Sequence, residues 1–269
     1  RTILLPSDQE LESPKALAEL IVGFGAGFLC TTPSRLSAFL KHPEFQQAMA
    51  RMESVVCGGE AFSSDLLQRL QLSTKARVYN QYGPSETTVA VSIKQLNGSA
   101  VITAGSPMAN CKLYVLDNWC NPLPIGVYGN LYVGGICVGK GYRNAPELTA
   151  ESFFDSPFDL GSRLYRTGDI ARWTPEGEIV LAGRSDRQVK LRGLRVEPQE
   201  VSDCLAKHPR VRQAAAVVQQ HGGQDVLLAF YTSDAPIPEE DLLSLCASYL
   251  PHYMIPSAIL PLAAIPLTA

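Results

Sequence analysis

Several features are scarce in this chain of 269 residues, and each scarcity argues against a class of protein. Charged residues make up only 18% and leave a net charge of −3, so the chain has no overall attraction for nucleic acid or an anionic membrane. Seven cysteines form no Cys-x-x-Cys pair, and four histidines are scattered without metal-ligand spacing. We therefore expect neither a disulfide framework nor a zinc knuckle. We expect a reducing, cytoplasmic compartment.

Long apolar runs are also missing. The most hydrophobic early stretch, residues 21–29, contains three glycines and is far too short to span a bilayer. The N-terminus lacks the basic-then-apolar pattern of a signal peptide. Hydrophobic residues nevertheless make up 46% of the chain, which is typical of a globular protein. The chain begins at Arg1 without a Met, and we expect it to be a piece of something longer.

The first part of the chain alternates short apolar runs with helical patterns. The runs near residues 28–30, 54–57 and 77–80 predict buried strands. Strands that alternate with helices favour parallel β-α-β units, whose ligands lie beyond the carboxyl ends of the strands. The glycine-bearing loops 58–61 and 80–86 fall at such ends, so we expect a binding site there.

The pattern changes twice further along the chain. From about Ser99, short strand patterns such as 112–116 and 130–133 follow one another without helices, which predicts a small antiparallel, barrel-like subdomain. After Gly193, two helical patterns flank two strands around a turn at 221–224, which predicts a compact α+β unit. We therefore expect three parts: the end of an α/β core subdomain (1–98), the barrel-like subdomain (99–185) and a small C-terminal α+β domain (186–269).

Residues 80–86 read Asn-Gln-Tyr-Gly-Pro-Ser-Glu and combine groups that suit a nucleotide. The ring of Tyr82 offers a face on which adenine can stack, and the amide of Asn80 can hydrogen-bond to a base edge. Ser85 supplies a hydroxyl for a phosphate oxygen, and Glu86 is a hard oxygen ligand suited to Mg²⁺. On these residues alone, a Gly-Pro turn with a surface tyrosine remains an alternative.

Residues 164–200 contain three further dense groups, at 167–169, 183–186 and 188–193. Each puts a charged side chain beside a glycine or a turn residue, which suits loops that hold a phosphorylated, polyhydroxylated ligand. The carboxylate of a Thr-Gly-Asp sequence can accept hydrogen bonds from both hydroxyls of a ribose. An aspartate in an Asx turn is the alternative for an isolated Thr-Gly-Asp.

Taken together, these motifs resemble those of the adenylation domains of nonribosomal peptide synthetases, members of the adenylate-forming enzyme superfamily. The resemblance extends to a Gly-Gly-Glu loop at 58–60 and a Leu-Pro-x-Tyr-Met-x-Pro segment at 250–256, which we expect to be a packing element. It implies the adenylate-forming fold and two reactions. ATP and an amino acid give aminoacyl-AMP and pyrophosphate, and the aminoacyl group then passes to the phosphopantetheine thiol of a carrier protein.

The resemblance also implies a role for individual residues. The expected catalytic residues are Ser85, Glu86 (the Mg²⁺ ligand), Arg184 and Lys190. Contacts to ATP or AMP are expected from Gly59, Glu60, Ala61, Asn80, Gln81, Tyr82, Gly83, Ser85, Asp169, Arg184 and Lys190. The amino-acid side-chain pocket is expected from Cys30, Val56, Gly58, Gln81, Val89 and Ala90. Asp186 is the expected hinge of the C-terminal domain, and Gly193 is expected near the pantetheine arm.

The implied partners are an amino acid, a peptidyl carrier protein with neighbouring synthetase domains, and an MbtH-like protein. The family's phosphate loop, the aspartate that binds the substrate amino group and a late catalytic lysine are not among the 269 residues. We therefore expect this chain alone to be inactive, and its amino acid stays unnamed. Asn130 and Lys140 replace the family's usual Glu and Arg, which is expected to matter only for local structure.

Two other readings remain open. An acyl- or aryl-CoA ligase of the same superfamily shares most of these motifs, although the Tyr-Arg-Thr-Gly-Asp and Gln-Val-Lys-Leu-Arg-Gly forms favour the synthetase. The alternative that is not an enzyme is a non-catalytic fragment that binds a nucleotide. Nucleotide binding without turnover would distinguish that fragment from an enzyme.

Overall fold

The structure is a computed structural model, and it describes residues 3–99, 101–186, 188–191, 193–221 and 224–266. The chain forms two compact units, Arg1–Ser185 and Asp186–Ala269. All seven cysteines are free thiols. In the described part of the chain, no helix is both long enough and apolar enough to cross a membrane.

The first unit begins with five helices and a five-stranded sheet. The helices are α1 (Asp8–Glu12), α2 (Pro14–Phe24), α3 (Pro33–Phe39), α4 (Pro43–Met49) and α5 (Ser64–Ser73). The strands are β1 (Phe28–Thr31), β2 (Ser54–Gly58), β3 (Arg77–Tyr82), β4 (Ser92–Gln95) and β5 (Ser106–Pro107). Strands β1, β2 and β3 are parallel neighbours, which confirms the predicted β-α-β units, whereas β4 and β5 continue the sheet in antiparallel pairing.

The two faces of this sheet differ. Val55, Cys57 and Val78 are buried in one hydrophobic core with side chains of helices α2 to α5, so these helices cover one face. Since strand side chains alternate, Val56 and its register partner Cys30 point to the opposite face. That face therefore carries side chains that the helix core does not use.

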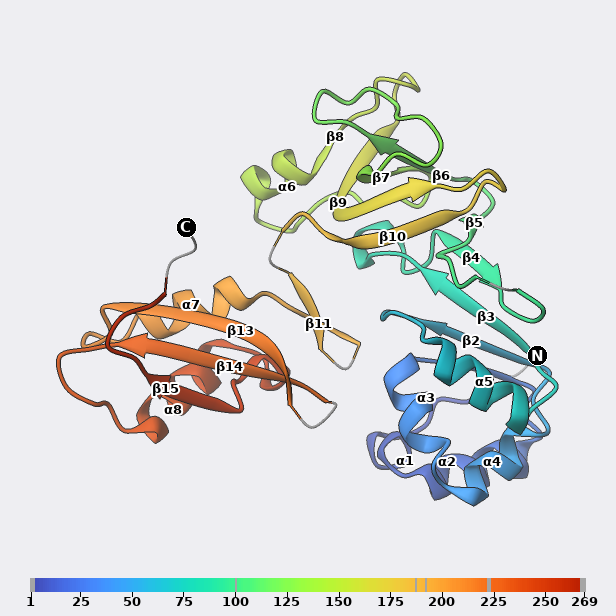
Figure 1. The fold of residues 1–269 in the computed structure, drawn as a ribbon, viewed down its shortest axis with the longest axis horizontal. Helices are drawn as coiled ribbons and strands as arrows, with labels where there is room; N and C mark the ends of the chain where they lie inside the picture. Colours follow the sequence, from blue (N-terminus) through green and yellow to red (C-terminus); the bar gives the residue numbers. More distant parts are fainter. Residues whose placement is uncertain (1–2, 100, 187, 192, 222–223, 267–269) are drawn as a thin grey trace. The chain divides into compact units, whose positions relative to one another are not determined.

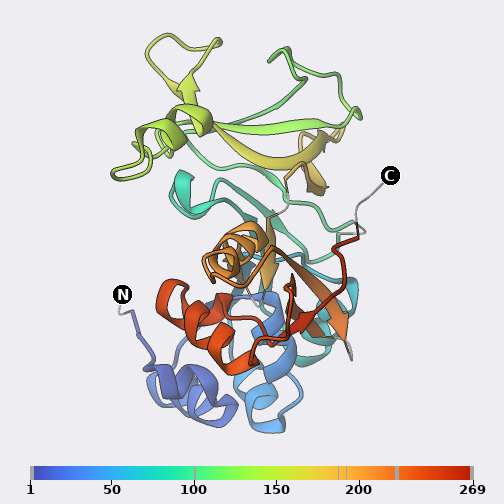
Figure 2. The same cartoon turned by 90° about the vertical axis from the view of Figure 1, so that its left-hand side faces the viewer.

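The second sheet of this unit is antiparallel. Its strands are β6 (Cys111–Leu116), β7 (Gly129–Gly135), β8 (Phe153–Asp155), β9 (Arg163–Trp173) and β10 (Ile179–Arg184), and helix α6 (Pro146–Ser152) precedes β8. The order is β10-β9-β7-β6, with β8 paired to β9. Within the first unit, this sheet and helices α1 to α5 lie at opposite ends (Figures 1 and 2), whereas α6 lies beside the sheet. A shared core that includes Tyr82, Val91 and Leu131 joins it to the end of the first sheet.

Strands β9 and β10 are irregular where the motifs lie. The β7–β9 register passes from Asn130↔Ile170 to Tyr132↔Arg166, so two extra residues bulge out of β9 in the region of 167–169. A second irregularity in β10 lies at Gly183, whose φ of 116° suits glycine. The loop expected at 167–169 is therefore wrong: the residues form a bulge inside a strand, because β9 pairs on both sides of them.

The second unit is a small α+β structure. Its elements are β11 (Val189–Leu191), β12 (Leu194–Val196), α7 (Pro198–Ala206), β13 (Gln213–His221), β14 (Gln224–Thr232), α8 (Glu239–Tyr249), η2 (His252–Met254) and β15 (Ala258–Pro261). Strands β13, β14 and β15 form a sheet, and α7 and α8 share its hydrophobic core. Met254 is buried in that core, which confirms the predicted packing of 250–256. The predicted turn at 221–224 falls partly outside the described residues.

Candidate nucleotide-binding site

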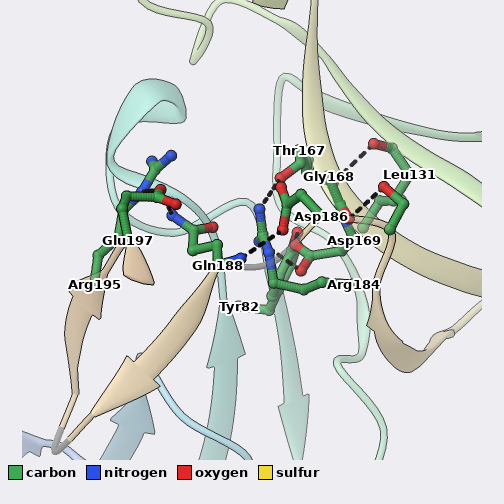
Figure 3. A network of polar contacts seen from close by, with 11 residues as sticks. Tyr82, Leu131, Thr167, Gly168, Asp169, Arg184, Asp186, Gln188, Arg195 and Glu197 are labelled. Carbon is green, nitrogen blue, oxygen red and sulfur yellow. Dashed lines mark hydrogen bonds and ion pairs between the residues drawn. The ribbon is translucent and has the colours of Figure 1, made fainter. Parts of the chain in front are cut away.

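The first unit brings together three side chains that are far apart in the sequence. The hydroxyl of Tyr82, at the end of β3, donates a hydrogen bond to Oδ2 of Asp169 in β9. Nη1 of Arg184, at the end of β10, lies 2.8 Å from Oδ1 of the same carboxylate. Figure 3 shows the aspartate between the phenol and the guanidinium. Both oxygens of one largely buried carboxylate thus have a protein donor.

The bulge in β9 fixes this aspartate. Thr167 Oγ1 donates to the Leu131 carbonyl at 2.8 Å and accepts from the Asp169 main-chain N–H at 3.0 Å. Arg184 Nη2 donates to the Thr167 carbonyl at 2.9 Å, so its two nitrogens bind two points of the same bulge. The second irregularity puts Arg184 directly opposite Asp169 in the strand pairing. The two irregularities therefore set the aspartate–arginine pair.

Tyr82 belongs to the protein interior. Its side chain is 7% exposed, so the alternative of a surface tyrosine is wrong. Burial, together with the negative charge of Asp169, raises the pKa of the Tyr82 phenol well above its ordinary value. The hydroxyl is therefore protonated at neutral pH and acts as a donor to the aspartate.

Glu86 follows β3 in the short turn η1 (Ser85–Thr87). Its Oε1 accepts a hydrogen bond of 2.8 Å from the hydroxyl of Tyr142. Ser85 beside it is exposed. No group of three or more His, Cys, Asp or Glu side chains forms a ready-made cation site in the described ranges. A metal at Glu86 would therefore take most of its ligands from phosphate and water oxygens, which Mg²⁺ accepts.

The other residues expected near the nucleotide are placed differently. Asn80 is buried, and its side-chain nitrogen donates to the Thr103 carbonyl at 2.7 Å. The carboxylate of Glu60 accepts hydrogen bonds of 2.8 Å from the main-chain N–H and the hydroxyl of Ser34, in the first turn of α3. Both side chains thus have internal partners. Gly59 lies next to this contact with a φ of 86°.

The residues expected in the amino-acid pocket share one face of the first sheet. Strand pairing aligns Cys30 with Val56 and, two residues further along β2, Gly58 with Gln81. A Cβ on Gly58 would come within 2.5 Å of Cγ of Gln81, so glycine leaves room for that glutamine. This is the face opposite the helix core. Four of the six expected pocket residues therefore line one surface.

The remaining two pocket residues follow η1. Val89 is 66% exposed, and Ala90 is half-buried. Val89 has a φ of 71°, which is rare for a β-branched residue. They belong to the loop that leads from β3 to β4 in the same sheet.

Three expected residues belong to the second unit. Oδ1 of Asp186, the expected hinge, accepts from the main-chain N–H of Gln188 at 3.2 Å. The side-chain nitrogen of Gln188 donates to Glu197 at 2.7 Å. Lys190 is exposed on β11, opposite Arg195 of β12. Gly193 lies in the turn between these two strands, so all three expected residues fall in or next to one short hairpin.

Comparisons with known proteins identify the family. Residues 1–143 match the family described as AMP-binding enzyme, and residues 200–269 match the AMP-binding enzyme C-terminal domain. The chain belongs to the AMP-binding enzyme family. Together with the synthetase relatives and the solved structure described next, this confirms the expected resemblance to adenylation domains and the expected fold class.

Among relatives of this AMP-binding protein, a dimodular nonribosomal peptide synthase of Bacillus subtilis is 39% identical over 99% of the chain. Tyrocidine synthase 3 of Brevibacillus parabrevis is 36% identical over 95% of it. The chain spans only 11% and 4% of these two proteins. The structure of holo-PA1221, a nonribosomal peptide synthetase protein with adenylation and PCP domains, has a TM-score of 0.84 and 27% identity, covering 99% of this chain and 46% of that one.

Three residues make contacts in the candidate site that the sequence did not predict. Thr167 holds the bulge, Tyr142 binds Glu86, and Thr103 accepts from Asn80. The Gly-x-Gly-Tyr sequence at 139–142 draws attention to Tyr142, but it does not predict the contact with Glu86, which lies 56 residues away. Nothing in the local sequence marks Thr103, since its partner lies 23 residues away.

Proposed function

We propose that the protein containing these residues activates an amino acid with ATP. The amino-acid carboxylate oxygen would attack the α-phosphorus, and pyrophosphate would leave with the electrons of the broken P–O bond. The observation that carries this proposal is the buried Asp169 carboxylate between Tyr82 and Arg184, in a chain of the AMP-binding family. A carboxylate fixed in this way is suited to accept the two hydroxyls of a ribose.

Charged residues around the phosphates complete the proposal. Arg184 and Lys190 would offset negative charge that develops at the α-phosphate, and Ser85 would donate to a phosphate oxygen. Glu86 would be the protein ligand of Mg²⁺, which supplies charge neutralisation to the phosphates when bound. A single carboxylate with phosphate and water oxygens fits the ordinary coordination of this ion. The main chain of 59–61 and 81–83 would line the adenine.

The pocket face supports an amino-acid substrate without naming one. Cys30, Val56 and Gly58 are small or apolar, and Gln81 adds an amide on the same face. Such a surface suits a side chain of moderate size that hydrogen-bonds to an amide. Val89 and Ala90 would contribute from the following loop.

The second half of the proposal is transfer to a carrier protein. The thiol of its phosphopantetheine arm would attack the acyl carbon, and AMP would leave. Asp186 would be the hinge for the rearrangement between the two reactions, and Gly193 would approach the arm. The likeness to a structure with adenylation and PCP domains supports this partner. An MbtH-like protein and a reducing, cytoplasmic compartment stay predictions.

Amino-acid-dependent ATP–pyrophosphate exchange tests the proposal. We would assay all twenty amino acids, with aryl and fatty acids as a second panel, on the 269-residue chain and on the protein in its natural length. Exchange with one or a few amino acids at natural length supports the proposal, and we expect none from the 269 residues. Exchange only with aryl or fatty acids, or silence from a folded protein that binds ATP, contradicts it.

A further inference from the structure

The backbone directly after the turn that carries Glu86 has an unusual conformation. Two consecutive residues after it, Thr88 and Val89, have φ values of 61° and 71°. Both are β-branched, and such side chains rarely adopt this left-handed region. A conformation of this kind persists only where surrounding contacts determine it. The position of Glu86 is therefore set from outside the turn.

Those contacts come from residues 137–142, which follow β7 in the second sheet. The main-chain N–H of Gly139 donates to the Glu86 carbonyl at 2.8 Å. Thr88 Oγ1 donates to the Cys137 carbonyl at 2.9 Å. The Tyr142 hydroxyl donates to Glu86 Oε1 at 2.8 Å. The same segment thus binds both the backbone and the carboxylate of Glu86.

Tyr142 is itself fixed on two sides. Its main-chain N–H donates to Oγ1 of Thr149 in α6 at 2.9 Å. Its ring meets Phe153 of β8 edge to face, with 5.5 Å between the ring centroids and an angle of 77°. Phe153 is buried and packs in turn on Tyr165 of β9. The hydroxyl that meets Glu86 is therefore positioned by the core of the second sheet.

We propose that Tyr142 is a positioning residue that orients the Glu86 carboxylate for a divalent cation on ATP. This inference rests on the proposed role of Glu86 as the metal ligand. A phenol is suited to the task, because it fixes the carboxylate by hydrogen bonding without neutralising its charge. Partners of metal ligands act in this way, and their loss typically weakens metal binding 10- to 100-fold.

The test replaces only the hydroxyl, in Tyr142→Phe of the protein at its natural length. The ring keeps its contact with Phe153, so the fold should persist. We expect the dissociation constant of Mn²⁺ in the presence of ATP, measured by electron paramagnetic resonance, to rise about tenfold. The Mg²⁺ concentration for half-maximal exchange should rise equally, with the KM for the amino acid unchanged.

Tyr114→Phe is the matched control. Its hydroxyl lies 3.4 Å from Oδ2 of Asp159, so the control also removes a phenol from a carboxylate, but one outside the proposed site. It should change neither Mn²⁺ affinity nor the Mg²⁺ requirement. Thr149→Val provides a second route, because it loosens Tyr142 without touching Glu86. We expect it to raise the Mn²⁺ dissociation constant about threefold, less than the 10- to 100-fold effect of removing a direct partner, because the Tyr142 hydroxyl is retained.

Glu86→Gln separates the two hypotheses. If Glu86→Gln weakens Mn²⁺ binding at least tenfold while Tyr142→Phe and Thr149→Val behave like the control, Glu86 is the metal ligand and the role of Tyr142 is refuted. If Glu86→Gln itself leaves Mn²⁺ binding unchanged, the proposed function of Glu86 fails first. A rise for both Tyr142→Phe and Glu86→Gln, with the control unchanged, is the result that supports the inference.

Discussion

Two ion pairs in the first unit are nearly equal in burial and yet differ in their surroundings. The side chains of Arg184 and Asp169 are 17% and 12% exposed, and those of Lys94 and Glu178 are 16% and 18% exposed. Each carboxylate also accepts a hydrogen bond from one hydroxyl. Tyr82 donates to Asp169, and Thr103 donates to Glu178 at 2.9 Å. Burial and pairing alone do not show which of the two serves a ligand.

The backbone distinguishes them. Asp169 and Arg184 follow Gly168 and Gly183, which have φ values of 78° and 116° at irregular points of two strands. Lys94 lies in the regular strand β4. It contacts both oxygens of Glu178, which precedes β10, at 2.5 and 2.6 Å, and so connects the two sheets. Glu178 also follows a glycine of positive φ, Gly177 (76°), but that glycine lies in a turn outside the strands. Asp169 and Arg184, by contrast, lie where the pairing of two strands is interrupted, and interruptions of this kind favour a site at the first pair and a structural tie at the second.

The largest expected effect comes from Asp169→Asn. One amide oxygen replaces two carboxylate oxygens, so a ribose loses a charged acceptor, worth roughly 1.5–3 kcal/mol per hydrogen bond. We expect the dissociation constant of ATP to rise about 100-fold in isothermal titration calorimetry of the protein at its natural length, or roughly 2.7 kcal/mol. Unchanged ATP affinity in a folded variant would contradict the assignment of this pair to the nucleotide.

Glu178→Gln should have the opposite profile. It leaves the ammonium of Lys94 largely buried without its carboxylate, which we expect to lower the unfolding free energy by about 2 kcal/mol. ATP affinity should stay the same. Both tryptophans of the chain, Trp119 and Trp173, belong to the first unit, so fluorescence during urea unfolding reports this unit.

A control for that variant is Asp159→Asn. Asp159 pairs with Lys112 on the surface, with side chains 36% and 51% exposed. Water screens this pair, so the variant should unfold almost like the parent chain. If Glu178→Gln and Asp159→Asn change the unfolding free energy equally, burial does not make the Lys94–Glu178 pair more important for stability than a surface pair.

The structural pair also predicts a pH dependence. Burial tends to raise the pKa of Glu178, but hydrogen bonds from Lys94 and Thr103 outweigh it and lower the pKa below its ordinary value. A lowered pKa in the fold means that the stabilisation is complete above the ordinary glutamate value and is lost as pH falls through the lowered one. Urea midpoints between pH 7 and pH 3 should therefore fall more steeply in the parent chain than in Glu178→Gln. Parallel curves would contradict this.

Local sequence predicted the parallel strands of the first sheet well, because strand formation depends on neighbours in the chain. The runs at 28–30, 54–57 and 77–80 lie within β1, β2 and β3, since apolar runs that contain aromatic or β-branched residues favour a buried sheet. The alternation with helices predicted their parallel order.

Long-range register could not be predicted in this way. Lys94 and Glu178 are 84 residues apart, and Glu86 and Tyr142 are 56 apart, so no local pattern links them. The bulge at 167–169 depends on how β7 pairs with β9, which the Thr-Gly-Asp sequence does not specify. Family motifs named Asp169 and Arg184, but the fold was needed to show Tyr82 between the sheets as their partner.

The smallest expected effect is that of Tyr82→Phe. It removes one hydroxyl donor from Asp169 and retains the buried ring, so we expect a loss of about 1 kcal/mol in unfolding free energy. ATP affinity should fall about fivefold, because Arg184 still orients the carboxylate. Since the pKa of the phenol is raised well above its ordinary value, this difference from the parent protein should stay constant from pH 6 to 9.

Tyr132→Phe is the control: it tests whether the loss of any buried phenol hydroxyl lowers ATP affinity, or only that of Tyr82. Tyr132 is 4% exposed in the same unit, and it is not one of the side chains that bind the Asp169 carboxylate, so its variant should retain ATP affinity. An affinity loss in Tyr82→Phe as large as in Asp169→Asn would mean that the phenol, rather than the guanidinium, holds the carboxylate. If Tyr82→Phe loses no ATP affinity at all, Arg184 alone orients the Asp169 carboxylate. The Asp169 and Glu178 pairs would then differ only in their cation, an arginine in one and a lysine in the other.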